Sequence, residues 1–124
     1  MSPRSKEFMD SARERLAGAR VALASDLPDL AAGAAYYAML YAARAALSER
    51  DVYAKTHSGV WTSFEEQFVI GGAFDPELVA EARRAQQIRE LGDYEARPPS
   101  EEDARLVVEH AGRFVTAVDE MLGE

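Results

Sequence analysis

The chain has 124 residues, of which 48% are hydrophobic and 29% charged, a composition typical of one folded domain and unlike that of a disordered protein. It has no cysteine and only two histidines, which excludes a disulfide framework, a thiolate zinc site and a thiol nucleophile. The net charge of −8 disfavours nonspecific binding to nucleic acid, because phosphate affinity comes mainly from lysine and arginine. We therefore expect one domain over residues 1–124 without metal or cofactor, and any RNA contact would need a local basic patch.

No segment has the pattern of a membrane anchor or an export signal. The longest uncharged stretch, residues 30–43, is bounded by Asp29 and Arg44 and is shorter than the roughly 20 apolar residues of a spanning helix. Residues 1–10 are charged and lack the apolar core of a secretory signal. We expect a cytoplasmic protein that makes no membrane contact.

Two long helices are predicted in the first half of the chain. Asp26 and Pro28 predict the start of the second of these, with Asp26 as its N-cap and Pro28 in its first turn. Residues 30–47 are rich in alanine and tyrosine on all sides, which indicates a central helix surrounded by others. The first helix is predicted from apolar residues that recur at spacings of four and three: Phe8, Ala12, Leu16, Ala19 and Leu23.

Three further helices are predicted in the second half. The first of them carries Trp61, Phe64 and Phe68 at helical spacing, which favours a place in the core or a dimer contact. The links between consecutive helices are short, which favours antiparallel neighbours. The fold class is therefore all-α, an antiparallel bundle of four to five helices. The predicted spans are 58–70, ended by Gly71-Gly72; Asp75-Pro76 to about Leu91; and a last helix that begins at Ser100 after Pro98-Pro99.

Three motifs follow one another along the chain: AYYAML at residues 35–40, KTHSGV at 55–60 and RELGDY at 89–94. In this order they resemble the YYA-bearing branch of HEPN domain proteins, over about residues 5–122. The resemblance implies an antiparallel helical bundle that forms a homodimer. It also implies a two-gene, toxin–antitoxin-like module in which the protein binds RNA or nucleotide and acts with a nucleotidyltransferase partner.

The resemblance also implies candidate catalytic residues. In catalytic members of the family, an arginine and a histidine a few residues later form a metal-independent RNase site that is completed across the dimer. Arg89 matches the arginine, but Asp93 lies near the place of the histidine. Such a reaction needs a cation for the phosphorane and a base for the 2′-hydroxyl, and carboxylates, with pKa values near 4, are poor proton donors at neutral pH. His57 is the other candidate base, and its alternative role is to cap or orient its loop.

The tyrosines of the central helix are candidate binding residues as well as core residues. Tyr36, Tyr37 and Tyr41 lie in a helix that is expected to be buried, where each ring fills space and each hydroxyl needs a partner. We expect at least two of them to serve packing, with one hydroxyl directed toward Arg89 or His57.

Tyr94 is a candidate modification site. It follows the place of the missing histidine, where some family members carry a tyrosine that the partner transferase adenylylates. The chain departs from its relatives at two further positions, with Ala34 where they often have arginine and Tyr41 where they often have histidine. Both departures remove polar groups that could serve a site.

The remaining charged candidates are expected to be ordinary surface. Four arginines cluster in the second half of the chain, and we expect them to offset neighbouring acids on a solvated face. His110 lies among acids and is expected to be solvated. The four arginines are Arg83, Arg84, Arg89 and Arg97.

The sequence leaves two hypotheses open: an RNase or nucleotide-binding subunit with a cleft at residues 89–94, and a noncatalytic structural or regulatory dimer in which that segment is packed.

Overall fold

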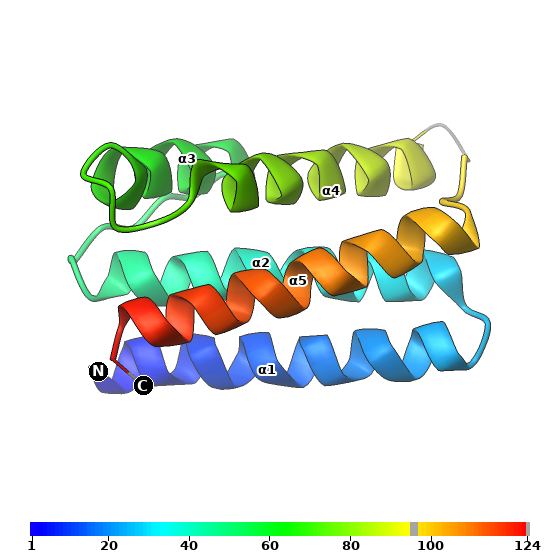
Figure 1. The fold of residues 1–124 in the computed structure, drawn as a ribbon, viewed down its shortest axis with the longest axis horizontal. Coiled ribbons are helices and arrows are strands. Elements are labelled where there is room, and N and C mark those ends of the chain that lie inside the picture. The colour runs from blue at the N-terminus through cyan, green and yellow to red at the C-terminus, as the bar shows by residue number, and fades with distance from the viewer. Residues whose placement is uncertain (95–96, 124) are drawn as a thin grey trace.

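A computed structural model describes residues 1–94 and 97–123, and in these ranges the chain forms helices and no strand (Figure 1). This confirms the predicted all-α bundle. None of the described helices combines the length and apolar character that a membrane-spanning helix needs. The helices are α1 (Pro3–Ala24), α2 (Pro28–Ser48), α3 (His57–Phe64), the π-helical turn η1 (Glu65–Val69), α4 (Pro76–Tyr94) and α5 (Glu101–Met121).

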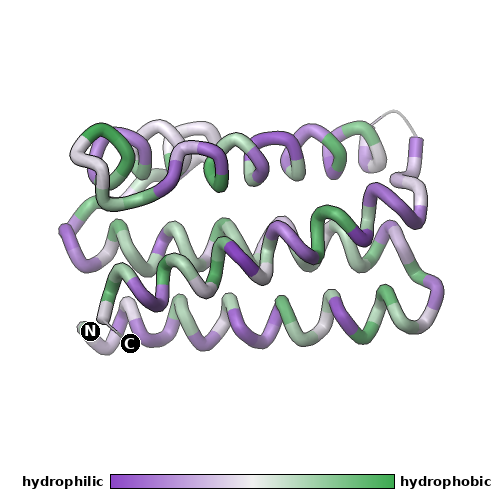
Figure 2. Tube along the Cα trace, viewed as in Figure 1, coloured by the Kyte–Doolittle hydropathy of each residue, from purple (hydrophilic) through white to green (hydrophobic). Residues whose placement is uncertain are grey.

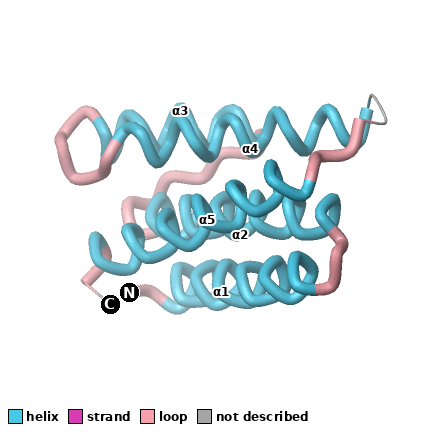
Figure 3. Tube along the Cα trace, turned by 45° about the vertical axis from the view of Figure 1, so that its right-hand side comes forward, coloured by secondary structure: helices cyan, strands magenta, loops and turns pink. Residues whose placement is uncertain are grey.

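Helix α2 is the centre of the bundle. It contacts α1, α3, α4 and α5, and with α5 it lies between α1 on one side and the layer of α3 and α4 on the other (Figures 1 and 3). Figure 2 shows hydrophilic and hydrophobic residues alternating along α1 and α5, as expected of helices with one buried face. In α2, by contrast, residues on several sides are buried, among them Ala31, Tyr36, Ala38 and Leu47. The prediction of a surrounded central helix is confirmed.

The predicted N-cap at Asp26 is wrong. Asp26 has a left-handed backbone with φ of 58°, and the residue before α2 is Leu27, which makes no side-chain cap. The amide of Leu27 donates to the carbonyl of Ala22 at 3.0 Å, and that of Asp26 donates to Leu23 at 3.3 Å. These two bonds form a Schellman motif, in which aspartate tolerates the left-handed position better than most residues. Asp26 therefore ends α1 instead of starting α2.

The other predicted helix boundaries are close to those observed. The hydroxyl of Ser100 accepts from the amide of Asp103 at 3.0 Å, and a carboxylate oxygen of Asp75 accepts from the amide of Glu77 at 2.9 Å. Helix α4 continues to Tyr94, beyond the predicted end near Leu91. The aromatic residues of α3 and η1 lie in the core, where Trp61, Phe64 and Phe68 are at most 3% exposed.

The prediction that His110 is solvated is wrong. Its Nε2 lies 3.3 Å from a carboxylate oxygen of Glu81, and the Arg113 guanidinium donates to the same oxygen at 3.0 Å. Glu81 is only 8% exposed, because α4 packs this face against α5. Burial lowers the pKa of His110, the charge of Glu81 opposes that shift, and Arg113 and Arg84 add to it.

We expect His110 to make folding sensitive to mild acid. Because the fold lowers the pKa of His110 below 6.5, the unfolded chain takes up this proton first as the pH falls, and the stability contributed by the neutral imidazole is lost. Urea unfolding of the wild type and of His110→Gln at pH 7.5 and pH 5.5 measures the effect. The wild type should lose more unfolding free energy than the variant over this interval, and equal losses would contradict the argument.

Candidate functional site

The three motifs, separate in the sequence, meet on one side of α2. The hydroxyl of Tyr36 and Nδ1 of His57 are hydrogen bonded at 3.0 Å. The guanidinium carbon of Arg89 lies 4.9 Å from the ring centroid of Tyr37 and 6.0 Å from that of Tyr36. Helices α2, α3 and α4 each supply one part of the cluster. The structure thus brings together Tyr36, Tyr37, His57 and Arg89. Asp93, which pairs with Arg89, is the fifth of the six predicted site residues to join them.

His57 is oriented by its neighbours and does not cap its own helix. It is the first residue of α3, and the cap is Thr56, whose hydroxyl accepts from the amide of Gly59 at 2.9 Å. The His57 ring meets the edge of Tyr37 at 5.9 Å between centroids and 89° between planes. Tyr36 is the one hydrogen-bond partner of His57 in the part of the chain that the structure describes, and it occupies Nδ1.

Burial and nearby charge keep the imidazole neutral. Burial lowers the pKa of His57 below 6.5, and the positive charges of Arg89 and Arg44 lower it further. Burial also raises the pKa of Tyr36 to about 12, although the charge of Arg89 opposes this. Near pH 7 the pair is therefore a neutral imidazole and a protonated phenol. A neutral imidazole can accept a proton, as a general base must.

Arg89 and Asp93 lie one turn apart on α4 and form an ion pair of 3.3 Å. Both line a groove of about 340 Å³, to which α2 contributes Gly33, Ala34 and Tyr37. Asp29, Arg15 and Pro99 lie in the wall of this groove as well. The segment 89–94 is thus solvent-facing along part of its length, as the hypothesis of a functional cleft requires.

Arg15 is a site residue that the sequence reasoning missed. Its guanidinium carbon lies 4.7 Å from the ring centroid of Tyr41 and 5.5 Å from that of Tyr37, so it faces Arg89 across Tyr37. Ala34 lines the same groove. Arg15 from α1 therefore supplies a cation close to the place where relatives carry an arginine on the central helix. Its signal in the sequence was a spacing: Arg15 stands three residues after Ala12 and four before Ala19, at the border of the apolar face of the first predicted helix.

The remaining predicted residues lie apart from the cluster. Tyr94 is 81% exposed at the end of α4 and lines a separate hollow with Leu91. Arg83 pairs with Glu65, and Arg84 pairs with Glu77 at 3.4 Å. As predicted, these two arginines offset neighbouring acids. Of the four clustered arginines, Arg89 is the one that lines the groove, and Arg97 is exposed.

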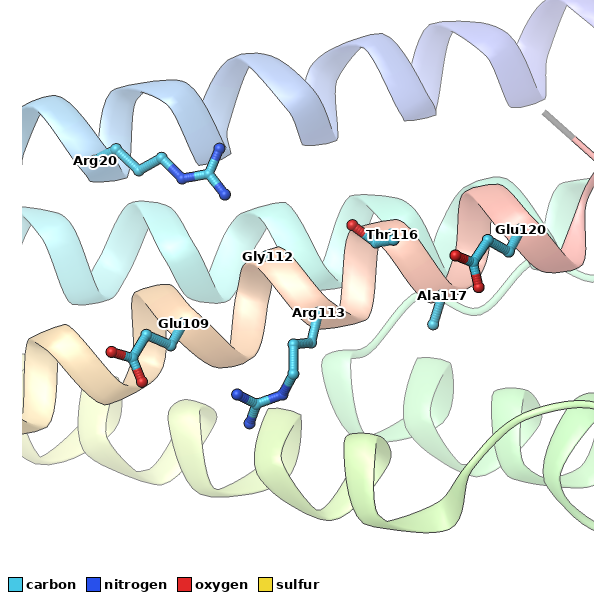
Figure 4. A pocket seen from close by; sticks show the side chains of 7 residues that line it. All are labelled: Arg20, Glu109, Gly112, Arg113, Thr116, Ala117 and Glu120. Atoms are coloured by element: carbon cyan, nitrogen blue, oxygen red, sulfur yellow. The ribbon is translucent and has the colours of Figure 1, made fainter.

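A larger hollow, of about 510 Å³, lies between α1 and α5 and contains none of the three motifs (Figure 4). It is lined by both signs of charge, with Arg20 and Arg113 set among Glu109 and Glu120. Within residues 1–94 and 97–123, no group of three or more histidine and carboxylate side chains is arranged to hold a metal ion. The described residues that line the hollow therefore include no group of candidate catalytic side chains like the one around Tyr36.

A family model described as "HEPN domain" matches residues 5–121. The chain belongs to the HEPN domain family. This confirms the resemblance carried by the three motifs, and it covers all the residues of the cluster. In this HEPN protein the motif histidine beside Arg89 is replaced, while His57 approaches the same arginine from another helix.

Full-length relatives support the assignment. The chain is 31% identical over 126 residues to the UPF0332 protein glr0978 of Gloeobacter violaceus, an alignment that covers all of both chains. It is 30% identical over 112 residues to a UPF0332 protein of Thermotoga maritima, covering 90% of this chain and 85% of the relative. It is 28% identical over 117 residues to a Methanocaldococcus jannaschii protein named "Putative toxin MJ0605", covering 94% and 87%.

The buried hydrogen bond between Tyr36 and His57 should contribute measurably to stability. Replacing Tyr36 with phenylalanine keeps the ring and leaves Nδ1 without its partner, so we expect the free energy of unfolding to fall by about 1 kcal/mol. Urea unfolding at pH 7.5 measures it, with Tyr53→Phe as the control because Tyr53 is 54% exposed. A Tyr36→Phe protein as stable as the control would show that this contact is not formed in solution.

Proposed function

We propose that this HEPN protein is the RNA-cleaving component of a toxin–antitoxin-like module, and that it cleaves single-stranded RNA without a metal ion at the Tyr36, His57 and Arg89 cluster. One observation carries the proposal: an imidazole and a guanidinium from two different helices meet at one pair of tyrosines, with His57 hydrogen bonded to Tyr36 at 3.0 Å and Arg89 4.9 Å from the ring centroid of Tyr37. These are the two groups that metal-independent cleavage needs. The toxin name of the Methanocaldococcus jannaschii relative supports it.

The proposed reaction is an attack by the RNA on its own backbone. Nε2 of His57 takes the proton of a 2′-hydroxyl, and the 2′-oxygen forms a bond to the adjacent phosphorus. The bond from phosphorus to the 5′-oxygen breaks, which leaves a 2′,3′-cyclic phosphate and, once the imidazolium proton reaches the leaving oxygen through solvent, a 5′-hydroxyl. Arg89 stabilises the charge that develops on the phosphorane, and Tyr36 holds the imidazole through Nδ1.

The proposal extends to partners. A homodimer would place two such clusters in one particle. A nucleotidyltransferase fits as the second protein of the module, because the net charge of −8 suits a protein surface with basic groups better than bare nucleic acid. The groove beside Tyr37 is less acidic than the chain as a whole, because its two arginines, Arg15 and Arg89, balance its two aspartates.

A second candidate function, a noncatalytic binding subunit that the transferase modifies, is favoured by one observation. Tyr94 is 81% exposed, and its hydroxyl is therefore accessible to an enzyme. In this version the protein presents Tyr94 for adenylylation, and the cluster around Tyr36 serves binding alone.

RNA cleavage distinguishes the first candidate. With single-stranded RNA in the presence of a chelator, we expect 2′,3′-cyclic phosphate ends from the wild type and a loss of about 100-fold or more in rate for His57→Gln and for Arg89→Ala. Arg105→Ala is the matched control, because Arg105 also pairs with a carboxylate four residues away on its own helix. No cleavage by the wild type, or equal rates for Arg89→Ala and Arg105→Ala, would overturn the proposal.

Mass spectrometry distinguishes the second candidate. After incubation with ATP and the nucleotidyltransferase proposed as the partner, we expect one or more adenylyl groups on the intact chain and none on Tyr94→Phe. The exposed Tyr53 serves as the control, and its phenylalanine variant should be modified like the wild type. An unmodified wild type, or modification that persists in Tyr94→Phe, would exclude Tyr94 as the acceptor.

A further inference from the structure

A second hollow, of about 220 Å³, lies beside the other half of α2 and is called here the Tyr53 pocket. Its floor is apolar and includes Phe8 and Val60. Arg4, Arg44 and Lys55 also line it, together with Tyr53 of the link between α2 and α3. None of these residues belongs to the cluster around Tyr36, and the proposed cleavage does not use them. The pocket combines an apolar floor with three cations.

The cations of the Tyr53 pocket have no carboxylate partner among the described residues. Within the described part of the chain, Arg4, Arg44 and Lys55 form no ion pair with a carboxylate. No carboxylate of residues 1–94 and 97–123 compensates these three positive charges, although the net charge of the chain is −8. Such a group of cations favours the binding of an anionic ligand. The arginines that pair with carboxylates elsewhere are Arg13, Arg83, Arg84, Arg89, Arg105 and Arg113.

Aromatic rings in the pocket supply surfaces on which a base can stack. Tyr53 is 54% exposed, and the Arg4 guanidinium carbon stands 4.5 Å from its ring centroid. Arg44 donates to the carbonyl of Ala54 at 2.8 Å, which fixes the link that carries Tyr53 and Lys55. Aromatic rings set among cations are the elements with which proteins hold single-stranded nucleic acid.

A row of side-chain contacts joins the pocket to the candidate site. Tyr37, Tyr41 and Arg44 are spaced four and three residues apart, so they share one face of α2. Seven residues of helix span about 10 Å, which is close to three nucleotides at the roughly 3.4 Å per nucleotide of a stacked strand. Between Tyr37 and Arg44, the rings of Phe8 and Tyr41 lie 6.1 Å apart, and the guanidinium of Arg15 covers Tyr41.

We propose that the Tyr53 pocket is a nucleotide subsite for single-stranded RNA, which holds the base of a nucleotide near the bond at His57. Tyr53 stacks on the base, and Lys55 and Arg44 contact the adjoining phosphates. This inference rests on the proposed function, because it assigns the path of the strand that reaches His57.

Binding of a fluorescein-labelled 2′-O-methyl oligouridylate tests the subsite, since this strand lacks the hydroxyl that cleavage requires. Anisotropy titrations over a range of salt concentrations compare the wild type with Lys55→Ala and Tyr53→Ala. We expect Tyr53→Ala to weaken binding by about five- to 100-fold, the effect of removing one stacking ring. Lys55→Ala should weaken binding and lower the slope of log affinity against log salt by about 0.7, the value for one phosphate contact.

The chain supplies its own matched control. Lys6 is the other lysine and is exposed on α1, so Lys6→Ala removes the same charge outside the pocket. If Lys55→Ala and Tyr53→Ala bind like Lys6→Ala while Arg89→Ala binds more weakly, the subsite is wrong and the proposed site stands. If the pocket variants weaken binding while His57→Gln and Arg89→Ala cleave RNA as fast as the wild type, the subsite is supported and the proposed site is wrong. A wild type that does not bind the strand overturns both.

Discussion

The burial of α2 is the constraint on which the rest of the structure depends. A helix surrounded by four others has little access to water, so a polar side chain on it needs a partner within the protein. Tyr36 is fully buried and finds its partner in His57, the first residue of α3. The position of α3 and the orientation of the imidazole thus follow from a packing requirement of the central helix. Tyr37, one residue later and only half-buried, turns toward the margin where Arg89 meets it.

The distribution of arginine partners shows how an acidic chain can carry a pocket lined by cations. Arginines such as Arg83 and Arg113 are compensated by carboxylates, which leaves them little capacity for a phosphate. Arg4 and Arg15 instead stand over aromatic rings. Such contacts orient the guanidinium through its face and leave its N–H groups in the plane for hydrogen bonds to an anion. A net charge therefore says less about partners than the identity of the groups that each arginine contacts.

The helices could be predicted from the sequence because periodicity, prolines and caps are local signals, and Pro28, Asp75 and Ser100 start helices as expected. The errors arise where the outcome depends on distant groups. His110 is half-buried because Glu81, far away in the sequence, faces it from α4. Arg15 enters the site through the packing of α1 on α2, which its spacing at the border of the apolar face does not specify. The motifs identified the cluster of Tyr36, His57 and Arg89, but not its geometry.

Asp93 stands near the place of the family's histidine. In the proposed chemistry its carboxylate is a partner of Arg89 and not a base. It pairs with Arg89 at 3.3 Å and is itself largely exposed, and ion pairs of this kind contribute little free energy. A phosphate can bind two N–H groups of a guanidinium at once and so displace such a partner. Asp93 would then hold Arg89 over the groove until RNA arrives, while the proton is taken by His57 from the other side. The replacement of one histidine thus need not abolish cleavage, because the base and the cation are carried by different helices.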